Sequence, residues 1–360
     1  MIPWFIILFV PALVMGYNRT ELVISKKGEK KINLGLAVCF MILFVFRGFR
    51  SISVGGDVIR YEVLFNELGR MDWTMGLTRS GYEVGYLAYC KLLYMIHPDY
   101  RTVLIVTSAI NTYSILRFVS KNSENPGLSL YCYIGLFFYA QSFNNERQAV
   151  AISLLMIAYE YVKSKQLFKF YLLVILASTF HISSVLFIAI YYLADLRFER
   201  GYWVAFVLSI GVAILGGAGI LGYVINRISF LNAKYSSYEL DSGAGYRLFA
   251  LIIVTILSQL FFFPREEREE DDLRIILHML NFSAILQCFS FRIGFFSRAV
   301  QIYYVSEILY FAKVITKLST NEKNNILARS MICLIILAYF VFMLNTNGIA
   351  VVPYSMASLQ

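Results

Sequence analysis

Residues 168–194, FKFYLLVILASTFHISSVLFIAIYYLA, decide the fold of this chain. A membrane-spanning helix needs about 20 consecutive, predominantly apolar residues, so this run is long enough to cross a bilayer. His181 lies at its middle, with hydroxyl side chains on both sides. A titratable residue within hydrocarbon is costly and usually serves a function. His181 is therefore interpreted either as a proton acceptor or as a hydrogen-bond donor to a pyrophosphate group. The alternative is a hydrogen bond between helices.

The composition of the whole chain supports the same class. The 360 residues are 59% hydrophobic and only 15% charged, whereas soluble domains contain about 25% charged residues. The net charge of +9 fits basic loops that fix topology and also fits attraction to anionic lipid or pyrophosphate. The five cysteines lack CxxC spacing and the three histidines form no ligand motif, so we predict no metal and no cofactor.

Apolar runs predict an all-α, polytopic membrane helix bundle of about twelve helices. We expect one transmembrane domain over residues 1–360, with its longest polar connections at 49–80, 226–245 and 264–272. The predicted helices cover residues 1–17, 32–48, 81–97, 100–119, 127–143, 147–163, 168–194, 202–225, 246–263, 273–290, 293–313 and 329–345.

Basic loops predict the orientation of these helices, because cytoplasmic loops carry an excess of Lys and Arg. Four lysines place the 18–31 loop in the cytoplasm, and the 49–80 segment then lies outside. The basic loop at 163–169 conflicts with this assignment if every run crosses the membrane once. Re-entrant segments that line a protein cavity would resolve the conflict, but the sequence does not locate them.

A first polar island follows the second apolar run. Arg47 and Arg50 are three residues apart, so at a helix end they share a face and could clamp one pyrophosphate through their planar donor forks. Gly55-Gly56 permits tight backbone geometry before Asp57, and Tyr61 shares its face if helix resumes. The alternative is a pair of snorkelling arginines at a membrane interface, followed by an N-capping Asp57.

A second polar island, Asn144-Asn145-Glu146-Arg147-Gln148, joins two apolar runs. This run of consecutive hydrogen-bonding side chains, ending in Gln148, favours a lined cavity over a lone interfacial anchor at Arg147. Three further candidates complete the set of substrate-binding residues: Glu83, Arg247 and Arg298.

These motifs resemble the EpsG family of Wzy-type polysaccharide polymerases. The matching segments occur in family order: FRGFRS (46–51), VGGDVIRY (54–61), GYEVGY (81–86), SFNNERQAVA (142–151), ASTFHISSVLF (177–187) and VVPY (351–354). One departure is Val84, where the family pattern usually has proline. The resemblance implies a fold similar to GT-C-like membrane glycosyltransferases and ligases, in the bacterial cytoplasmic membrane, with the active site facing outward.

The resemblance also implies the reaction. Oligosaccharide repeat units linked to undecaprenyl pyrophosphate are joined by glycosyl transfer, as in O-antigen, capsule or exopolysaccharide synthesis, with inversion at the anomeric carbon. A chain-length regulator and a flippase would be its protein partners, and nucleic acid would not be one. The chemistry needs cations for the departing pyrophosphate and a base for the acceptor hydroxyl.

The candidate residues can be assigned to these two roles. We expect Arg147, with Arg50 and Arg47, to hold the pyrophosphate. We expect Asp57 or His181 to act as the base, and Gln148, Asn144 and Tyr61 to position sugars. The alternative function is a transporter or flippase of lipid-linked saccharides, which would more often show an internal repeat.

Overall fold

The computed structural model describes residues 1–17, 23–24, 32–79, 81–197, 204–211, 242–290, 294–318 and 323–357. It divides into two compact units. The first comprises Met1–Ile157, Thr179–His181 and Phe311–Gln360, and the second Ala158–Ser178 and Ile182–Tyr310.

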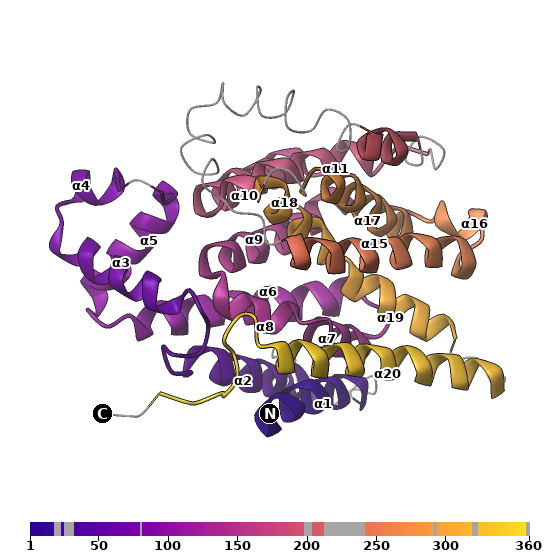
Figure 1. Ribbon diagram of the computed structural model, residues 1–360, viewed down its shortest axis with the longest axis horizontal. Coiled ribbons are helices and arrows are strands. Elements are labelled where there is room, and N and C mark those ends of the chain that lie inside the picture. The colour runs from indigo at the N-terminus through magenta and orange to yellow at the C-terminus, as the bar shows by residue number, and fades with distance from the viewer. Residues whose placement is uncertain are drawn as a thin grey trace. The chain divides into compact units, whose positions relative to one another are not determined.

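The first unit is built almost entirely from helices (Figure 1). Two strands of two residues each, β1 (Val23–Ile24) and β2 (Ile32–Asn33), pair antiparallel. The helices are α1 (Ile2–Tyr17), α2 (Leu34–Gly48), α3 (Val58–Arg70), α4 (Trp73–Leu77), α5 (Val84–Ile96), α6 (Arg101–Asn122), α7 (Pro126–Gly135), α8 (Phe138–Asn144) and α20 (Lys323–Thr346).

Helix α9 (Glu146–Lys163) begins in the first unit and ends in the second, and α19 (Glu307–Lys317) runs from the second unit into the first. Residues 204–211 of the second unit are also helical. Its other elements are α10 (Leu167–Phe180), the 3-10 helix η1 (Ile182–Phe187), α11 (Ile188–Leu193), α15 (Ser242–Phe262), α16 (Arg265–Arg268), α17 (Asp271–Ser290) and α18 (Gly294–Tyr304).

The predicted all-α class is confirmed, and apolar helices of this kind fit a membrane protein. Among the described residues, three helices are long and apolar enough to cross a bilayer: Arg101–Asn122, Asp271–Ser290 and Ile326–Thr346. Most other apolar helices are shorter than the ~20 residues that a full crossing needs. The count of twelve spans and the likeness to GT-C enzymes therefore stay predictions.

Three predicted continuous helices are wrong, because the structure breaks each of them. The 127–143 run is interrupted at Phe137, whose φ of 74° is left-handed. The 168–194 run stops at Phe180, leaves His181 non-helical and resumes as η1. The 293–313 run divides between α18 and α19. The break at Phe137 falls in an unbroken apolar stretch, whereas polar residues mark the other two, His181 with its neighbouring Ser and Thr residues and Ser306-Glu307. In membranes such irregular backbone is tolerated where protein buries it or where it lines a cavity.

The predicted polar connection at 49–80 contains two helices that pack on α5. The buried face of α3 follows helical periodicity, with Tyr61, Leu64, Phe65 and Leu68 in one apolar core that also includes residues of α5. Lys91 on α5 donates from Nζ to the carbonyl oxygens of Leu68 and Met71, at 3.0 and 2.5 Å, and so satisfies orphan carbonyls at the end of α3. This packing fixes where the polar residues before α3 and α5 lie.

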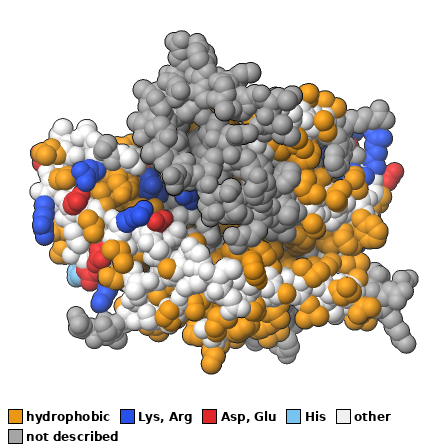
Figure 2. All heavy atoms as spheres, viewed as in Figure 1, with side chains coloured by type: hydrophobic (Ala, Val, Ile, Leu, Met, Phe, Trp, Pro, Cys, Tyr) orange, Lys and Arg blue, Asp and Glu red, His pale blue; other side chains and the backbone are white. Residues whose placement is uncertain are grey.

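Surface side chains of the first unit are unevenly distributed (Figure 2). Charged side chains gather over the α3–α5 end, whereas hydrophobic side chains cover the face over α20. Exposed apolar residues on α20 include Leu327, Met331, Leu334, Ile335 and Phe342. An apolar helix face this exposed fits contact with lipid.

Gly55 is required by the turn that precedes α3. Its φ is 112°, and a Cβ atom there would lie 2.8 Å from the carbonyl oxygen of Phe143. We expect Gly55→Ala to lower the free energy of unfolding by about 1–3 kcal/mol, because it combines backbone strain with a backbone clash. Thermal unfolding of the purified protein in detergent measures this loss.

Gly16→Ala is the matched control. A Cβ atom at Gly16 meets nothing within 4 Å, and alanine favours helix over glycine by about 1 kcal/mol. We expect unchanged or slightly raised stability. Equal stability of both variants would show that the turn does not need glycine.

Candidate functional site

The candidate site is built around the junction between α8 and α9, within the first unit. Helix α8 ends at Asn144 and α9 begins at Glu146, so the junction occupies a single residue, Asn145. Glu146 and Arg147 are neighbours in the chain, yet their side chains contact different partners. The predicted lined junction thus forms two separate polar clusters.

The first cluster is a buried ion triad. Glu146 accepts from Arg47 at 3.0 Å and from Arg50 at 2.5 Å, and all three side chains are fully buried. Further donors of Arg47 and Arg50 reach the carbonyl oxygens of Ser142 (2.7 Å) and Phe143 (3.0 Å). The guanidinium of Arg50 also lies 4.7 Å from the centre of the Phe143 ring.

The triad changes the interpretation of Arg47 and Arg50. The sequence analysis assigned both to a pyrophosphate clamp, with snorkelling as the alternative, but neither side chain has any exposed surface. Their forks are directed at Glu146 and at backbone carbonyls instead. Two cations with one carboxylate leave a net positive charge in the interior, which contributes a favourable potential for nearby anions. The geometry therefore supports a structural and electrostatic role rather than direct contact.

The second cluster is centred on Arg147. Its Nη1 atom lies 2.5 Å from Glu83 Oε2, and its Nε atom lies 3.5 Å from the Tyr61 hydroxyl. The guanidinium also lies 4.9 Å from the Tyr82 ring centre and 5.9 Å from that of Tyr61. The contacts with Glu83 and Tyr61 hold the guanidinium in one orientation, and 17% of the Arg147 side chain remains exposed to solvent.

Glu83 joins Arg147 to His181. Its second oxygen, Oε1, lies 3.7 Å from His181 Nδ1, and both side chains are almost completely buried. Glu83 precedes α5 with extended backbone, while His181 lies in the break between α10 and η1. The broken helix explains how a histidine from an apolar run reaches a carboxylate.

Asp57 is held by Asn144, the last residue of α8. The Asp57 N–H donates to Asn144 Oδ1 at 2.8 Å, and Asn144 Nδ2 donates to Asp57 Oδ2 at 3.2 Å. Asp57 occupies the N-cap position of α3, but its side chain makes no capping hydrogen bond there. The carboxylate is 34% exposed, with Arg60 at 3.9 Å. Asp57 is more exposed than Glu83, the other predicted acid. Gln148, which follows Arg147 in the chain, is buried.

A family match accompanies this geometry. The model of the EpsG family matches residues 34–356. The chain belongs to the EpsG family. These are Wzy-like polymerases, so a polysaccharide-polymerase-like function follows in general terms. No curated protein and no solved structure matches the chain significantly.

The EpsG-family motifs named in the sequence analysis meet in the first unit. Arg47, Asp57, Glu83, Arg147 and His181 come from five of them and are connected through the two clusters. Sequence analysis missed that Glu146 is the partner of two arginines and that Glu83 bridges Arg147 and His181. Charge balance could have indicated these pairs, because a buried arginine needs a carboxylate partner and the apolar segments contain few carboxylates.

Two further residues are predicted to bind substrate, Arg247 and Arg298. The side chain of Arg247 is outside the described residues. Arg298 is partly buried on α18 of the second unit. Substrate binding by Arg247 and Arg298 therefore stays a prediction.

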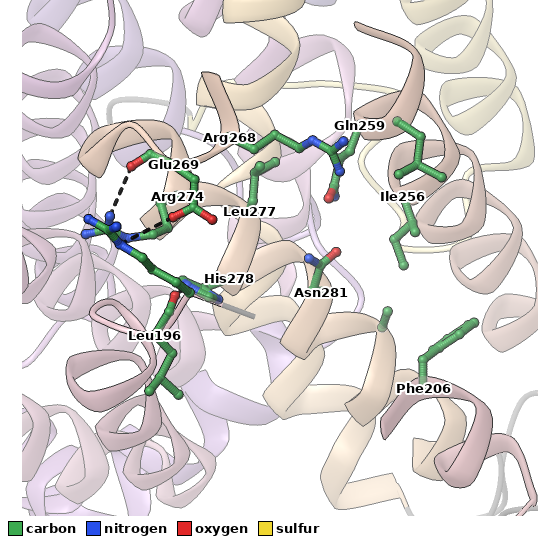
Figure 3. Close-up of a pocket in the computed structure, with 13 residues that line it drawn as sticks. Leu196, Phe206, Ile256, Gln259, Arg268, Glu269, Arg274, Leu277, His278 and Asn281 are labelled. Atoms are coloured by element: carbon green, nitrogen blue, oxygen red, sulfur yellow. Dashed lines mark hydrogen bonds and ion pairs between the residues drawn. The ribbon is translucent and has the colours of Figure 1, made fainter. Parts of the chain in front are cut away.

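The second unit of this EpsG-family chain has a cavity of its own (Figure 3). Two of its three arginines form ion pairs, since Arg274 lies 2.7 Å from Asp271 and Arg197 lies 3.6 Å from Glu269. His278 contacts the Leu196 carbonyl at 2.8 Å, a contact that fits a structural role. Of the described residues predicted for the site, none lines this cavity.

The buried triad predicts a large stability effect. Glu146→Gln removes the only carboxylate that contacts Arg47 and Arg50 among the described residues. Breaking a buried ion pair by removing one partner costs about 3–5 kcal/mol. We expect Glu146→Gln to accumulate poorly in membranes and to unfold at a clearly lower temperature in detergent.

The control for this prediction is Glu67→Gln. Glu67 pairs with Arg79 at 2.8 Å, but both side chains are at least 40% exposed, and exposed pairs contribute only about 0–1 kcal/mol. Similar unfolding temperatures for the two variants would contradict a stabilising role of the triad.

Proposed function

We propose that this EpsG-family protein is an inverting glycosyltransferase that polymerises oligosaccharide repeat units linked to undecaprenyl pyrophosphate. It acts at the outer face of the bacterial cytoplasmic membrane in O-antigen, capsule or exopolysaccharide synthesis. The acceptor hydroxyl of one unit attacks the anomeric carbon of the growing chain, and the bond from that carbon to the pyrophosphate oxygen breaks.

The observation that carries this proposal is the environment of Arg147. A partly exposed guanidinium is fixed by Glu83 and faces two tyrosine rings, Tyr61 and Tyr82. A cation held rigidly in an apolar bundle is suited to stabilise negative charge that develops on a leaving group. Aromatic rings beside it offer apolar faces on which a sugar can rest.

The two carboxylates of the Arg147 region have different environments and hence different proposed roles. Asp57 is accessible and oriented by Asn144, so it accepts the proton of the attacking hydroxyl. Glu83 is buried between Arg147 and His181, so it orients the arginine. His181 then positions Glu83, which leaves Asp57 as the preferred base of the two candidates.

The fold supports an outward-facing site. The basic 18–31 loop precedes α2, and Arg47 lies in the last turn of that helix. At about 1.5 Å per residue, the 15 residues of α2 separate the two ends by roughly 22 Å. If the loop is cytoplasmic, the clusters lie toward the opposite face. Pyrophosphate-linked saccharide on that face is the substrate, and a flippase and a chain-length regulator are the expected protein partners.

Arg147→Lys tests the proposal, because it keeps the charge and removes the planar fork. We expect the purified variant to convert defined lipid-linked repeat units to polymer about 10²–10³ times more slowly than the wild type. Polymer length on a gel and the release of undecaprenyl pyrophosphate report the rate.

Arg79→Lys is the matched control, since Arg79 lies in the same unit with a carboxylate partner but is 45% exposed. Near wild-type polymerisation by Arg147→Ala would remove the proposal. If the wild type instead moves lipid-linked saccharide across vesicles without joining it, the chain is a transporter.

A further inference from the structure

The chain segment after α20 returns to the candidate site. Residues Asn347–Ala357, here called the C-terminal strap, run back toward the end of α2 (Figure 1). Ser51 N–H donates to the Ser355 carbonyl and Ala357 N–H to the Phe49 carbonyl, both at 2.9 Å. The strap contains the VVPY motif, which the proposed function does not use.

The strap holds the turn that carries Asp57. Gly55 N–H donates to the Ala350 carbonyl at 2.8 Å, and Gly56 N–H donates to the Ile349 carbonyl at 3.0 Å. The next N–H, that of Asp57, is taken by Asn144 at 2.8 Å. Three successive N–H groups are thus fixed, two by the strap and one by a residue of the candidate site.

Asn347 shapes the strap for this contact. Its Oδ1 atom accepts from Val351 N–H at 2.8 Å and from Val352 N–H at 2.9 Å, and its backbone is left-handed with a φ of 46°. Asparagine tolerates this conformation and commonly closes such turns. The turn it closes contains Ile349 and Ala350, whose carbonyls reach the glycines.

Tyr354 anchors the far end of the strap to α2. Its ring stacks on Phe46 with centroids 3.8 Å apart and an angle of 4°, and its hydroxyl donates to the Phe46 carbonyl at 2.8 Å. Phe46 directly precedes Arg47 of the buried triad. The strap therefore fixes both ends of the segment from Arg47 to Asp57.

We propose that Asn347 and Tyr354 are positioning residues of the transfer site, an inference that rests on the proposed polymerase function. Gly56 is exposed, so water could satisfy its N–H without the strap. The main effect of the strap bonds is therefore to restrict the conformation of the turn, and they bury little additional surface. An ordered turn fixes Asp57 relative to Asn144, and misplacing a reacting group by about 1 Å costs roughly 100-fold in rate.

The test compares paired substitutions in the polymerisation assay. Asn347→Ala removes both accepted bonds and the bond that Nδ2 donates to the Val352 carbonyl at 2.5 Å, whereas Asn347→Asp keeps an acceptor oxygen and loses only the donated bond. Tyr354→Ala removes the stack, whereas Tyr354→Phe keeps it. We expect each alanine variant to lose at least about tenfold in kcat with an unchanged KM, more than its fall in unfolding temperature accounts for. Tyr354→Phe should recover most of that loss and Asn347→Asp part of it, because the aspartate lacks the donor to the Val352 carbonyl. Tyr113→Ala, at a tyrosine that is 51% exposed, is the control.

A second readout does not depend on catalysis. Val54 in the turn is fully buried, so in a background without the five native cysteines a Val54→Cys reporter should react slowly with a maleimide. We expect Asn347→Ala to speed this labelling several-fold, whether or not the protein polymerises saccharide. A wild type that does not polymerise overturns the proposed function, while the labelling still decides whether the strap holds the turn.

Three outcomes would overturn the strap proposal. Faster labelling with unchanged kcat would show that the turn opens without affecting transfer. Lost activity with unchanged labelling would show that Asn347 does not act through the turn. Activity losses that follow the unfolding temperature in both the alanine and the conservative variants would assign the strap to stability alone.

Discussion

The ion triad of Glu146 with Arg47 and Arg50 is the interaction on which the rest of the site depends. Desolvating charges is costly, and Glu146 stabilises two arginines that have no exposed surface. It also ties the end of α2 to the start of α9, which are far apart in sequence. Because Glu146 faces inward at the first turn of α9, the next residue, Arg147, is directed toward α3 and α5.

The sequence motifs suggest one polar site, but the structure forms two clusters with different roles, the ion triad and the Arg147 cluster. The ion triad is fully buried; it holds the ends of α2 and α9 together and contributes a positive electrostatic potential. The second cluster keeps the guanidinium of Arg147 partly exposed, and the Asp57 carboxylate, held by Asn144, is exposed as well. Glu146 of the first cluster and Arg147 of the second are adjacent in the chain, so both clusters start from the first turn of α9. The proposed transfer reaction would need this combination, because fixed charges must still contact a large lipid-linked substrate.

Broken helices make these clusters possible in an apolar chain. A continuous helix over 168–194 would satisfy its own backbone through the position of His181. Stopping at Phe180 frees that position to approach Glu83. The left-handed Phe137 similarly separates α7 from α8 before the junction. Both breaks are buried in protein, which is the condition under which irregular backbone is tolerated in membranes.

The sequence by itself determined the all-α class, the positions of most helices and the family, because these depend on hydrophobic runs and local motifs. It also selected Asp57, Glu83, Arg147 and His181, since polar residues stand out in an apolar chain. Only the tertiary structure decided that Glu146 belongs to Arg47 and Arg50 while Glu83 belongs to Arg147. It alone revealed the C-terminal strap. Ion pairing and strap contacts join residues about 60 to 300 positions apart, and no local periodicity encodes which distant partners meet.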